Sequence, residues 1–457
     1  MTTSPRPSCN LAALVIVTAW VTTLAINAPG HLSFDSVVQF LEGRTGVYGS
    51  MHPPVMSALI GLTDRVVPGT GLYLGVATAP FFGALLLASR QPAVPIAWRL
   101  LPLILLAAAL FSPVLVIYQG IVWKDVLFAN LAVAAFAVAG VALDREASSG
   151  RSAGAWALAI GLAGFAATVR QNGMLVPLGI AIIFAVSRPA PAGLLRRAGA
   201  AALTLAAALG AMVVLQVAVR STAVVPPADT TRIGLRVLQA YDIQGMAARG
   251  AAVPALGTLD AASAATIAGH AARNYQAARL DPPGAESPPT ALVSLAPPEI
   301  HRIWWTMLQA DPAAYLAHRA AVLRWHLWPT DIMNCLPVYV GVGGPPEALV
   351  ALRLSQGTRP GDEQLWRLAH PFFDTLLFRH GAWLLASLAI AAILAWRRLS
   401  EPADLSVLLL QVTALAFAAS YAVIGIACDF RYLLFVPISV CFGLAHLARG
   451  RRRAARP

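Results

Sequence analysis

Lysine is almost absent from this 457-residue chain, because Lys124 stands alone and the other 32 of the 33 basic residues are Arg. Charge of either sign is also scarce: charged residues make up 12% of the chain, whereas hydrophobic residues make up 58%. Soluble domains carry about 25% charged residues. The composition therefore excludes an ordinary soluble protein and indicates a polytopic membrane protein.

Cysteine is rare as well. Cys9, Cys335, Cys428 and Cys441 are too scattered to form a metal site, and their spacing predicts no disulfide. The net charge of +12 does not indicate nucleic-acid binding, since Arg mostly flanks apolar runs and no aromatic-basic motif is present. The sequence also has neither the internal repeats nor the paired broken helices that are typical of many transporters.

Long apolar runs are abundant. Ten of them are long enough to cross a hydrocarbon core, near 10–28, 71–89, 100–118, 124–143, 153–170, 172–187, 199–219, 379–396, 405–426 and 431–448. We therefore expect an all-α polytopic protein with about ten transmembrane helices. No A-x-A cleavage site follows the first run, so we interpret it as an uncleaved helix and not as a signal peptide.

The run 53–67 decides the topology. If it lies on the outer surface, the Arg-rich loops fall on the cytoplasmic side, as the positive-inside rule requires. These loops hold Arg90, Arg99, Arg145, Arg151, Arg188, Arg196, Arg197, Arg397, Arg398 and the basic tail. The run is also short, at about 21 Å, for a core of ~30 Å. We therefore predict an in-plane helix here and cytoplasmic N- and C-termini.

This topology divides the chain into three parts. Residues 1–219 form an N-terminal transmembrane core with a first outer loop at 29–67, and residues 379–457 hold the last three spans and a basic cytoplasmic tail. Residues 220–378 form a mainly helical periplasmic region, in which Asp311 and Pro312 predict a helix start. Trp304, Trp305, Trp325 and Trp328 in this region indicate helices at the membrane interface, with stacking on sugars as the alternative.

Polar residues from several separate loops fall on the same outer face. Asp35 lies in the first turn of a short amphipathic helix that Ser33 can cap. The positive helix end keeps such a carboxylate ionised, as a proton-accepting base must be. The alternative is that the acid stabilises the helix and does no chemistry.

His52 and the adjacent residues Lys124 and Asp125 can likewise be interpreted either as functional or as structural residues. His52 precedes two prolines, and it either contacts a phosphate or simply ends the loop. Lys124 and Asp125 open a span, and adjacent helix residues do not face each other. Lys124 binds a phosphate or extends to the membrane interface, while Asp125 gains nothing from anionic headgroups.

Arg170 and Arg431 lie in tight outer turns, against the positive-inside bias. Phosphate is a suitable partner because Arg binds it through two parallel hydrogen bonds. The alternative is internal pairing, either of Asp125 with Arg170 or of Asp429 with Arg431.

The order of these motifs resembles the GT-C glycosyltransferases. The motifs are PG…FDS…Q before a HPP (29–54), KD at 124–125, RQN at 170–172, the stretch DPAAYLAHRAAVLRW (311–325) and DFRYLLFVP at 429–437. The branch that contains protein O-mannosyltransferases and lipid A aminoarabinose transferases is the most similar. The resemblance covers the membrane core and is faint over 230–300. The first loop has one acid instead of a pair, and His52 stands where the aminoarabinose branch has Lys.

The resemblance implies a function. Asp35 would be the catalytic acid, Asp125 a second acid for a metal or the acceptor, and His52, Lys124, Arg170 and Arg431 contacts of the donor phosphate. The resemblance implies a polyprenyl-phosphate sugar as the donor and a glycan, lipid or protein as the acceptor. If a metal cofactor takes part, the resemblance implies a divalent ion. We expect an inverting glycosyltransferase of a bacterial inner membrane that works at the periplasmic face.

Two other classes of function stay open. A transporter or flippase would use the charges to bind ions or headgroups, but the charges gather at one face and not at mid-bilayer. A glycan polymerase or ligase would use Arg and His of a large late loop, where His301, His318 and His326 lie.

Overall fold

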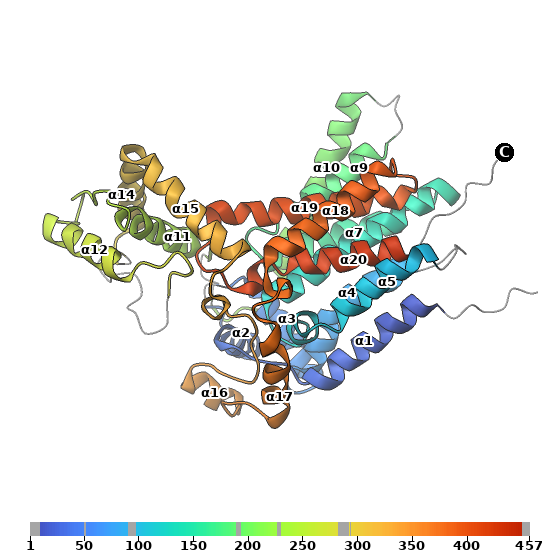
Figure 1. Cartoon of the computed structure of the whole chain (residues 1–457), viewed down its shortest axis with the longest axis horizontal. Coiled ribbons are helices and arrows are strands. Elements are labelled where there is room, and N and C mark those ends of the chain that lie inside the picture. Colours follow the sequence, from blue (N-terminus) through green and yellow to red (C-terminus); the bar gives the residue numbers. More distant parts are fainter. Residues whose placement is uncertain are drawn as a thin grey trace, which may run out of the picture.

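The computed structural model describes residues 10–49, 52–89, 97–188, 193–225, 230–281, 292 and 294–449, with the backbone alone at 97–99 and 230–231. All the regular elements in these ranges are helices, and extended segments meet only in isolated bridges. The all-α prediction is therefore confirmed for the part of the chain that the structure describes. Figure 1 shows a helical bundle with further helices gathered at one end.

The predicted spans coincide with apolar helices. These are α1 (Leu11–Asn27), α4 (Gly71–Ser89), α5 (Ala97–Leu110), α6 (Pro113–Tyr118), α7 (Lys124–Ser149), α8 (Ala153–Val169), α9 (Leu175–Val186), α10 (Leu194–Ser221), α18 (His380–Trp396), α19 (Pro402–Ile424) and α20 (Phe435–Arg449). Among the described residues, α4, α7, α10 and α19 are long and apolar enough to cross a membrane by length and composition, and six other apolar helices are shorter. The count of ten spans stays a prediction.

The predicted run 100–118 is two helices and not one. α5 ends at Leu110, and the Ser112 side chain accepts a hydrogen bond from the Leu115 backbone at the start of α6. Pro113 occupies the first position of α6, where its missing N–H is not needed. A new cap therefore ends one helix and begins another inside a continuous apolar run.

α7 is the central helix of the bundle. Every side chain from Asp125 to Gly140 is buried, as expected for a helix that is apolar on all sides. Its neighbours are α4, α8, α19 and α20. α10, by contrast, exposes apolar side chains such as Leu195, Leu203 and Val214.

The first loop folds into a pair of short helices, α2 (Phe34–Thr45) and α3 (Pro54–Val66). They meet at Gly43 and Gly61, where an added Cβ on either residue would lie 2.0 Å from the backbone of the other helix. α3 has 13 residues and is therefore about 20 Å long, too short for a core of ~30 Å. Leu62 and Val66 on α3 are exposed. Its orientation in the membrane plane stays a prediction.

The region 220–378 consists of two parts. α11 (Thr230–Ala247), α12 (Ala261–Asn274), α14 (Pro297–Ala310) and α15 (Pro312–Leu327) share a small apolar core of their own. The segment after them holds η1 (Ile332–Cys335), α16 (Pro346–Leu352), α17 (Pro360–Ala369), η2 (His370–Phe372) and η3 (Leu376–Phe378), and it packs against the main core. Asp311 caps α15 with Pro312 at its first position, as the sequence predicts.

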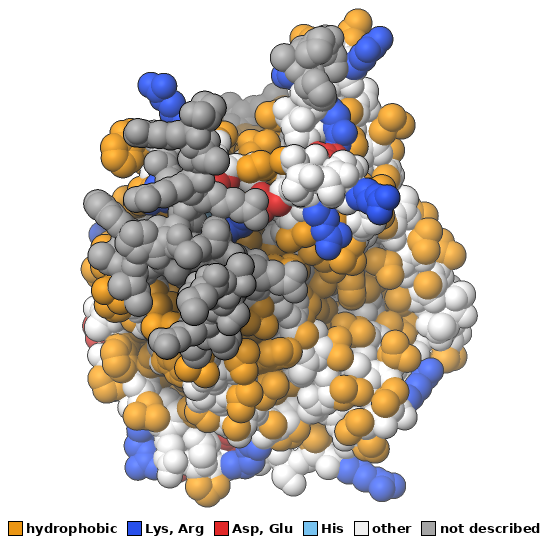
Figure 2. Space-filling model, turned by 90° about the vertical axis from the view of Figure 1, so that its right-hand side faces the viewer, with side chains coloured by type: hydrophobic (Ala, Val, Ile, Leu, Met, Phe, Trp, Pro, Cys, Tyr) orange, Lys and Arg blue, Asp and Glu red, His pale blue; other side chains and the backbone are white. Residues whose placement is uncertain are grey.

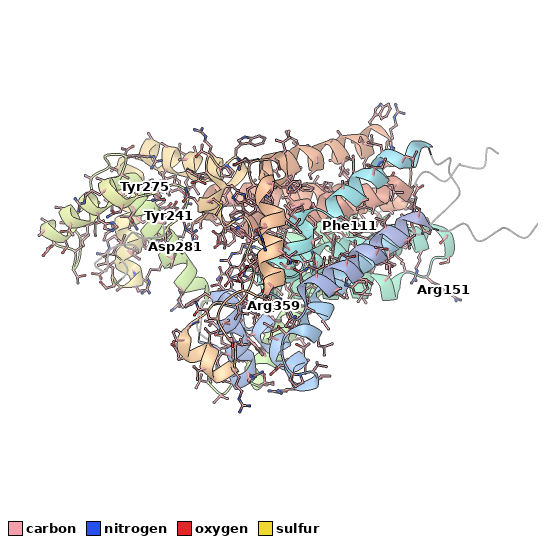
Figure 3. The ribbon with its side chains drawn as sticks, turned by 60° about the horizontal axis from the view of Figure 1, so that its bottom comes forward. Phe111, Arg151, Tyr241, Tyr275, Asp281 and Arg359 are labelled. Carbon is pink, nitrogen blue, oxygen red and sulfur yellow. A yellow bond between two sulfur atoms is a disulfide. The ribbon has the colours of Figure 1, made fainter. Side chains whose placement is uncertain are left out.

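The two ends of the molecule differ. Tyr241 and Tyr275 lie at one end and Arg151 at the other (Figure 3). Figure 2 looks onto the end where α7 and α20 finish, and its described surface carries more Lys and Arg than Asp and Glu between apolar areas.

A disulfide joins Cys335 to Cys428 across a sequence separation of 93 residues. It ties η1 to the turn between α19 and α20. The spacing of the cysteines did not predict this bond, because pairing depends on which loops the fold brings together.

Candidate active site

The segment before α2 is held between two other segments. The His31 backbone N–H donates to Gly120 O at 2.9 Å, and Val122 N donates back to His31 O at 3.0 Å. On the other side, Leu32 N donates to Gly341 O at 2.9 Å, and Gly343 N donates to Leu32 O at 2.8 Å. These bonds place the first turn of α2 beside the first turn of α7.

Side chains fix the same junction. The Trp123 indole N–H donates to Ser33 Oγ at 2.7 Å, and the Ser36 hydroxyl donates to Val122 O at 2.7 Å. Ser33 is the N-cap residue of α2, as predicted, and Asp35 lies in the first helical turn. The helix end carries positive partial charge, which favours an ionised carboxylate there.

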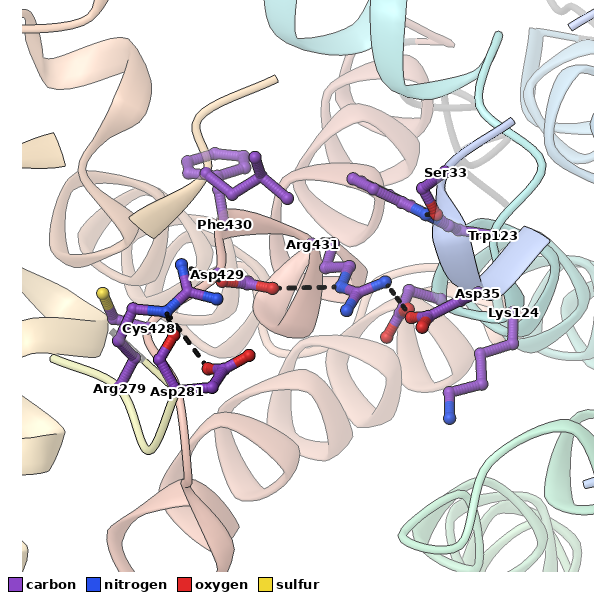
Figure 4. Close-up of polar contacts among 12 residues, drawn as sticks. Ser33, Asp35, Trp123, Lys124, Arg279, Asp281, Cys428, Asp429, Phe430 and Arg431 are labelled. Atoms are coloured by element: carbon purple, nitrogen blue, oxygen red, sulfur yellow. Dashed lines mark hydrogen bonds and ion pairs between the residues drawn. The ribbon is translucent and has the colours of Figure 1, made fainter. Parts of the chain in front are cut away.

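Asp35 belongs to a series of alternating charges, shown in Figure 4. Arg431 Nη1 donates to Asp35 Oδ2 at 2.7 Å, and Arg431 Nε lies 3.3 Å from Asp429 Oδ2. The other oxygen of Asp429 lies 3.7 Å from Arg279 Nη1, and Arg279 Nε lies 3.1 Å from Asp281 Oδ1. The turn between α19 and α20 therefore reaches α2 through a single guanidinium group.

His52 and Lys124 complete the other side of Asp35. His52 Nε2 lies 3.5 Å from Asp35 Oδ1, and Lys124 Nζ lies 3.0 Å from His52 Nδ1. An ammonium group can only donate, and the other ring nitrogen of His52 faces Asp35. The structure thus places Lys124 against His52.

Asp125 pairs with Arg170, whereas its neighbour Lys124 contacts His52. Its Oδ1 contacts Arg170 Nη1, and Arg170 Nη2 donates to the Tyr421 hydroxyl. This is the internal pairing that the sequence left open, and it engages the guanidinium that was predicted to bind phosphate. Asp125 Oδ2 is buried without a hydrogen-bond partner among the described residues.

Aromatic rings separate the two ion pairs. The Tyr432 ring lies 5.7 Å from the Arg170 guanidinium and 5.2 Å from that of Arg431. The Trp123 ring lies 4.8 Å from Arg431. These distances are within the range of cation–π attraction. Sequence reasoning missed both rings, although each is the direct neighbour of a residue that it singled out.

The charge state of Asp35 follows from these contacts. Burial by itself would raise the pKa of Asp35, but the Arg431 guanidinium and the His52 ring outweigh it and hold the pKa well below the usual value. The side chain is still 28% exposed, so a ligand can reach it. All six residues that the sequence proposed for the site thus lie around one location, with Asp35 paired and ionised.

The groups around Asp35 do not fit a divalent metal ion. Ca²⁺ and Mg²⁺ take about six or more ligands, most of them oxygens, and Zn²⁺ takes about four from Cys, His, Asp and Glu. Among the residues that the structure describes, no three His, Cys, Asp or Glu side chains are placed to hold one ion. Arg431 and Lys124, both cationic, are the partners of Asp35 and His52. We therefore derive no step through a metal.

The tryptophans of the region 220–378 differ in their surroundings. Trp304 packs in the small core and its indole N–H donates to Asp242 at 2.9 Å, so it has a structural role. Trp325 packs against the main core. Trp305 and Trp328 are exposed at 47% and 45%, and their interfacial or sugar-stacking role stays a prediction.

The three histidines considered for a polymerase or ligase differ in their surroundings, since His318 and His326 are buried and His301 is exposed on α14. His318 Nε2 lies 3.0 Å from Asp242 Oδ1, and its Nδ1 lies 2.7 Å from the Tyr275 hydroxyl. His301 lies 2.9 Å from Gln239. His326 contacts the Tyr421 ring at 5.2 Å and thus borders the Arg170 pair.

Comparison with known proteins gives little information about this chain. No family model and no curated protein matches the chain. Solved structures of the archaeal oligosaccharyltransferase of Archaeoglobus fulgidus match it with low scores. The complex with Zn and sulfate has a TM-score of 0.40 at 12% identity, over 94% of this chain and 48% of that one.

Two further structures of that enzyme give similar values. AglB with an inhibitory peptide and a dolichol-phosphate has a TM-score of 0.39 at 12% identity, over 95% of this chain and 50% of that one. The apo form has a TM-score of 0.40 at 13% identity, over 96% and 50%. The chain spans about half the length of these structures, and a likeness at this level carries no conclusion about fold or activity.

Proposed function

We propose that this protein is an integral-membrane inverting glycosyltransferase that moves a sugar from a polyprenyl-phosphate donor to an acceptor. The observation that carries the proposal is the surroundings of Asp35. A partly exposed, ionised carboxylate lies at a helix start and contacts Arg431 and His52, with Lys124 directly behind. Such a site offers a base and a set of cationic donors in one place.

The reaction needs both kinds of group. The Asp35 carboxylate takes the proton from an acceptor hydroxyl or amine, whose oxygen or nitrogen then bonds to the anomeric carbon. The bond between that carbon and the phosphate oxygen breaks, and polyprenyl phosphate leaves with the electron pair. Arg431 and Lys124 stabilise the negative charge that develops on the leaving phosphate. A single displacement of this kind inverts the anomeric centre.

In this mechanism Arg431 binds first the Asp35 carboxylate and then the donor phosphate. While it is paired with Asp35, the carboxylate is a weak base, because its pKa is held low. A donor phosphate would compete for the same guanidinium, since Arg binds phosphate bidentately. When Arg431 turns to the phosphate, the proton affinity of Asp35 rises. The base would therefore become effective only when the donor is bound.

The proposed location is the periplasmic face of a bacterial inner membrane. The Cys335–Cys428 disulfide adjoins Asp429 and the site, and disulfides persist in oxidising compartments. The opposite end of the bundle carries more basic than acidic side chains, which is typical of cytoplasmic loops. Both observations support a site outside the cytoplasm, with α2 and α3 on the outer surface.

The test uses the full chain in lipid nanodiscs. We expect the protein to release polyprenyl phosphate from at least one radiolabelled polyprenyl-phosphate sugar among mannose, glucose and aminoarabinose. Lys124→Ala removes a charged phosphate contact and should raise the KM for that donor about tenfold or more.

The matched control is Arg151→Ala, which removes a cation just beyond the other end of α7 and should leave the KM for the donor unchanged. If wild-type protein consumes none of the three donors, the proposed donor class is wrong. If Lys124→Ala binds the donor as well as wild type does, Lys124 has no role at the phosphate.

A further inference from the structure

A pocket of about 670 Å³ lies between the segment 336–340 and α17, outside the Asp35 cluster. Its walls are partly aromatic, since they include Tyr339 and Trp366. Its rim is polar and exposed, and consists of Thr358, Glu363 and Arg367. No residue of this pocket has a role in the transfer step described above.

The pocket is connected to the site through one pair of rings. Tyr339, which lines the pocket, lies 6.2 Å from the Trp123 ring between centroids. Trp123 in turn carries the Arg431 guanidinium at 4.8 Å and donates to Ser33, the cap of the helix that holds Asp35. The backbone reinforces the link, because Leu32 pairs with Gly341 and Gly343 directly after the pocket segment.

The lining indicates the chemistry of the ligand. Pockets with aromatic walls and a few polar groups contact the apolar face of a ligand and orient it by hydrogen bonds. Glu363 accepts and Arg367 donates, and their charges cancel, so the rim does not select an anion such as phosphate. A polyprenyl tail would desolvate both charged groups without bonding to them, which is costly. A neutral polyhydroxylated ring satisfies the walls and the rim together.

We propose that this pocket binds the carbohydrate part of the acceptor. The proposal rests on the transferase function given above and narrows the acceptor to a glycan or a glycan-bearing lipid. A sugar chain seated against Trp366 would extend past Tyr339 toward Arg431, which brings its terminal hydroxyl to the base. Trp366 is held for this role by an edge-on contact with Phe373, with ring centroids 5.3 Å apart.

The experiment measures binding and needs no transfer. Full-length protein in nanodiscs is titrated with maltotriose, cellotriose, mannotriose and chitotriose by saturation-transfer NMR. We expect at least one trisaccharide to bind, and Trp366→Ala to weaken it about tenfold. Because Trp366→Ala also removes the contact with Phe373, Arg367→Gln provides a second variant at an exposed position and should weaken binding as well.

Leu368→Ala is the matched control, since Leu368 is exposed on the same helix and does not line the pocket. The inference is overturned if none of the four sugars binds, if both pocket variants bind as wild type does, or if a short polyisoprenyl phosphate displaces the sugar. If the protein consumes the donor but fails this binding test, the proposed function stands and the proposed acceptor pocket is wrong. Sugar binding without donor consumption would support the carbohydrate pocket and overturn the proposed donor class.

Discussion

Asp35 shows how far a single residue can be understood from sequence. Its place in a first helical turn followed from the apolar spacing and from Ser33. Its partners did not, because Arg431 lies 396 positions away and only the fold brings the two together. For the same reason the sequence could not decide whether Arg170 binds phosphate or pairs with Asp125. The types of residue were predictable, the Asp125–Arg170 and Asp429–Arg431 pairs were foreseen only as alternatives, and the Arg431–Asp35 pair was not foreseen.

The Arg431–Asp35 contact predicts a pH effect. Since the folded pKa of Asp35 lies below the unfolded value of about 3.9, the pair stabilises the protein fully above that pH and loses this contribution as the pH falls toward the folded pKa. Asp35 therefore does not titrate between pH 5 and 8 in the free wild-type protein.

Arg431→Ala removes the main group that opposes burial, so the pKa of Asp35 should rise and the acid limb of the pH profile of kcat/KM should move to higher pH. Donor affinity should fall as well, and Arg431→Lys should restore part of both properties. A profile that keeps its wild-type acid limb in Arg431→Ala would mean that Arg431 does not set the pKa of the base.

At the level of secondary-structure elements, the helices were predictable from the sequence, but the breaks and connections between them were not. The apolar runs located α7, α19 and α20, since length and hydropathy are local properties. The break between α5 and α6 depends on the cap at Ser112, and the division of 220–378 depends on which apolar faces meet. The segment 336–343 gave no sequence signal, yet it pairs with Leu32 and lines the pocket.

The Cys335–Cys428 disulfide should stabilise this arrangement. It closes a loop of 93 residues, for which chain entropy gives about 4 to 5 kcal/mol in the unfolded-state model. Cys335→Ala with Cys428→Ala should lower the melting temperature by several degrees and reduce transfer, because Asp429 directly follows Cys428. Thermal unfolding with and without reductant measures this.

Cys441→Ala is the control, since Cys441 is a free buried cysteine in α20. The difference in melting temperature between Cys441→Ala and wild type should be the same with and without reductant. The melting temperature of reduced wild type should approach that of the double variant. A wild-type protein that melts at the same temperature with and without reductant would show that the bond contributes no stability.

For the whole molecule, the account requires the two ends of the bundle to face different compartments. Asp35, Lys124, Arg170 and Arg431 lie near one another, and their common outer face stays a prediction. The Arg bias of the loops is the basis of the proposed topology.

A topology reporter fused after Arg398 should read cytoplasmic, and one fused after Asp281 should read periplasmic. Asp281 lies within the region 220–378 that connects the two groups of apolar helices, and Arg398 follows α18. If the Arg398 fusion reads periplasmic, the number of crossings before it is odd and the predicted ten-span topology is wrong. If both read cytoplasmic, the site faces the wrong side for the proposed reaction.

The most direct test of the account is the turnover of Asp35→Asn. Asparagine retains the volume but cannot accept the proton, so transfer from the polyprenyl-phosphate donor should fall about 10²- to 10⁴-fold while donor binding persists. Asp64→Asn is the matched control, because Asp64 is also a carboxylate paired with an Arg, at 2.7 Å from Arg44 Nη2. Loss of that pair costs only about 0.2–1 kcal/mol and should barely change turnover. Near-normal transfer by Asp35→Asn would contradict the assignment of Asp35 as the base.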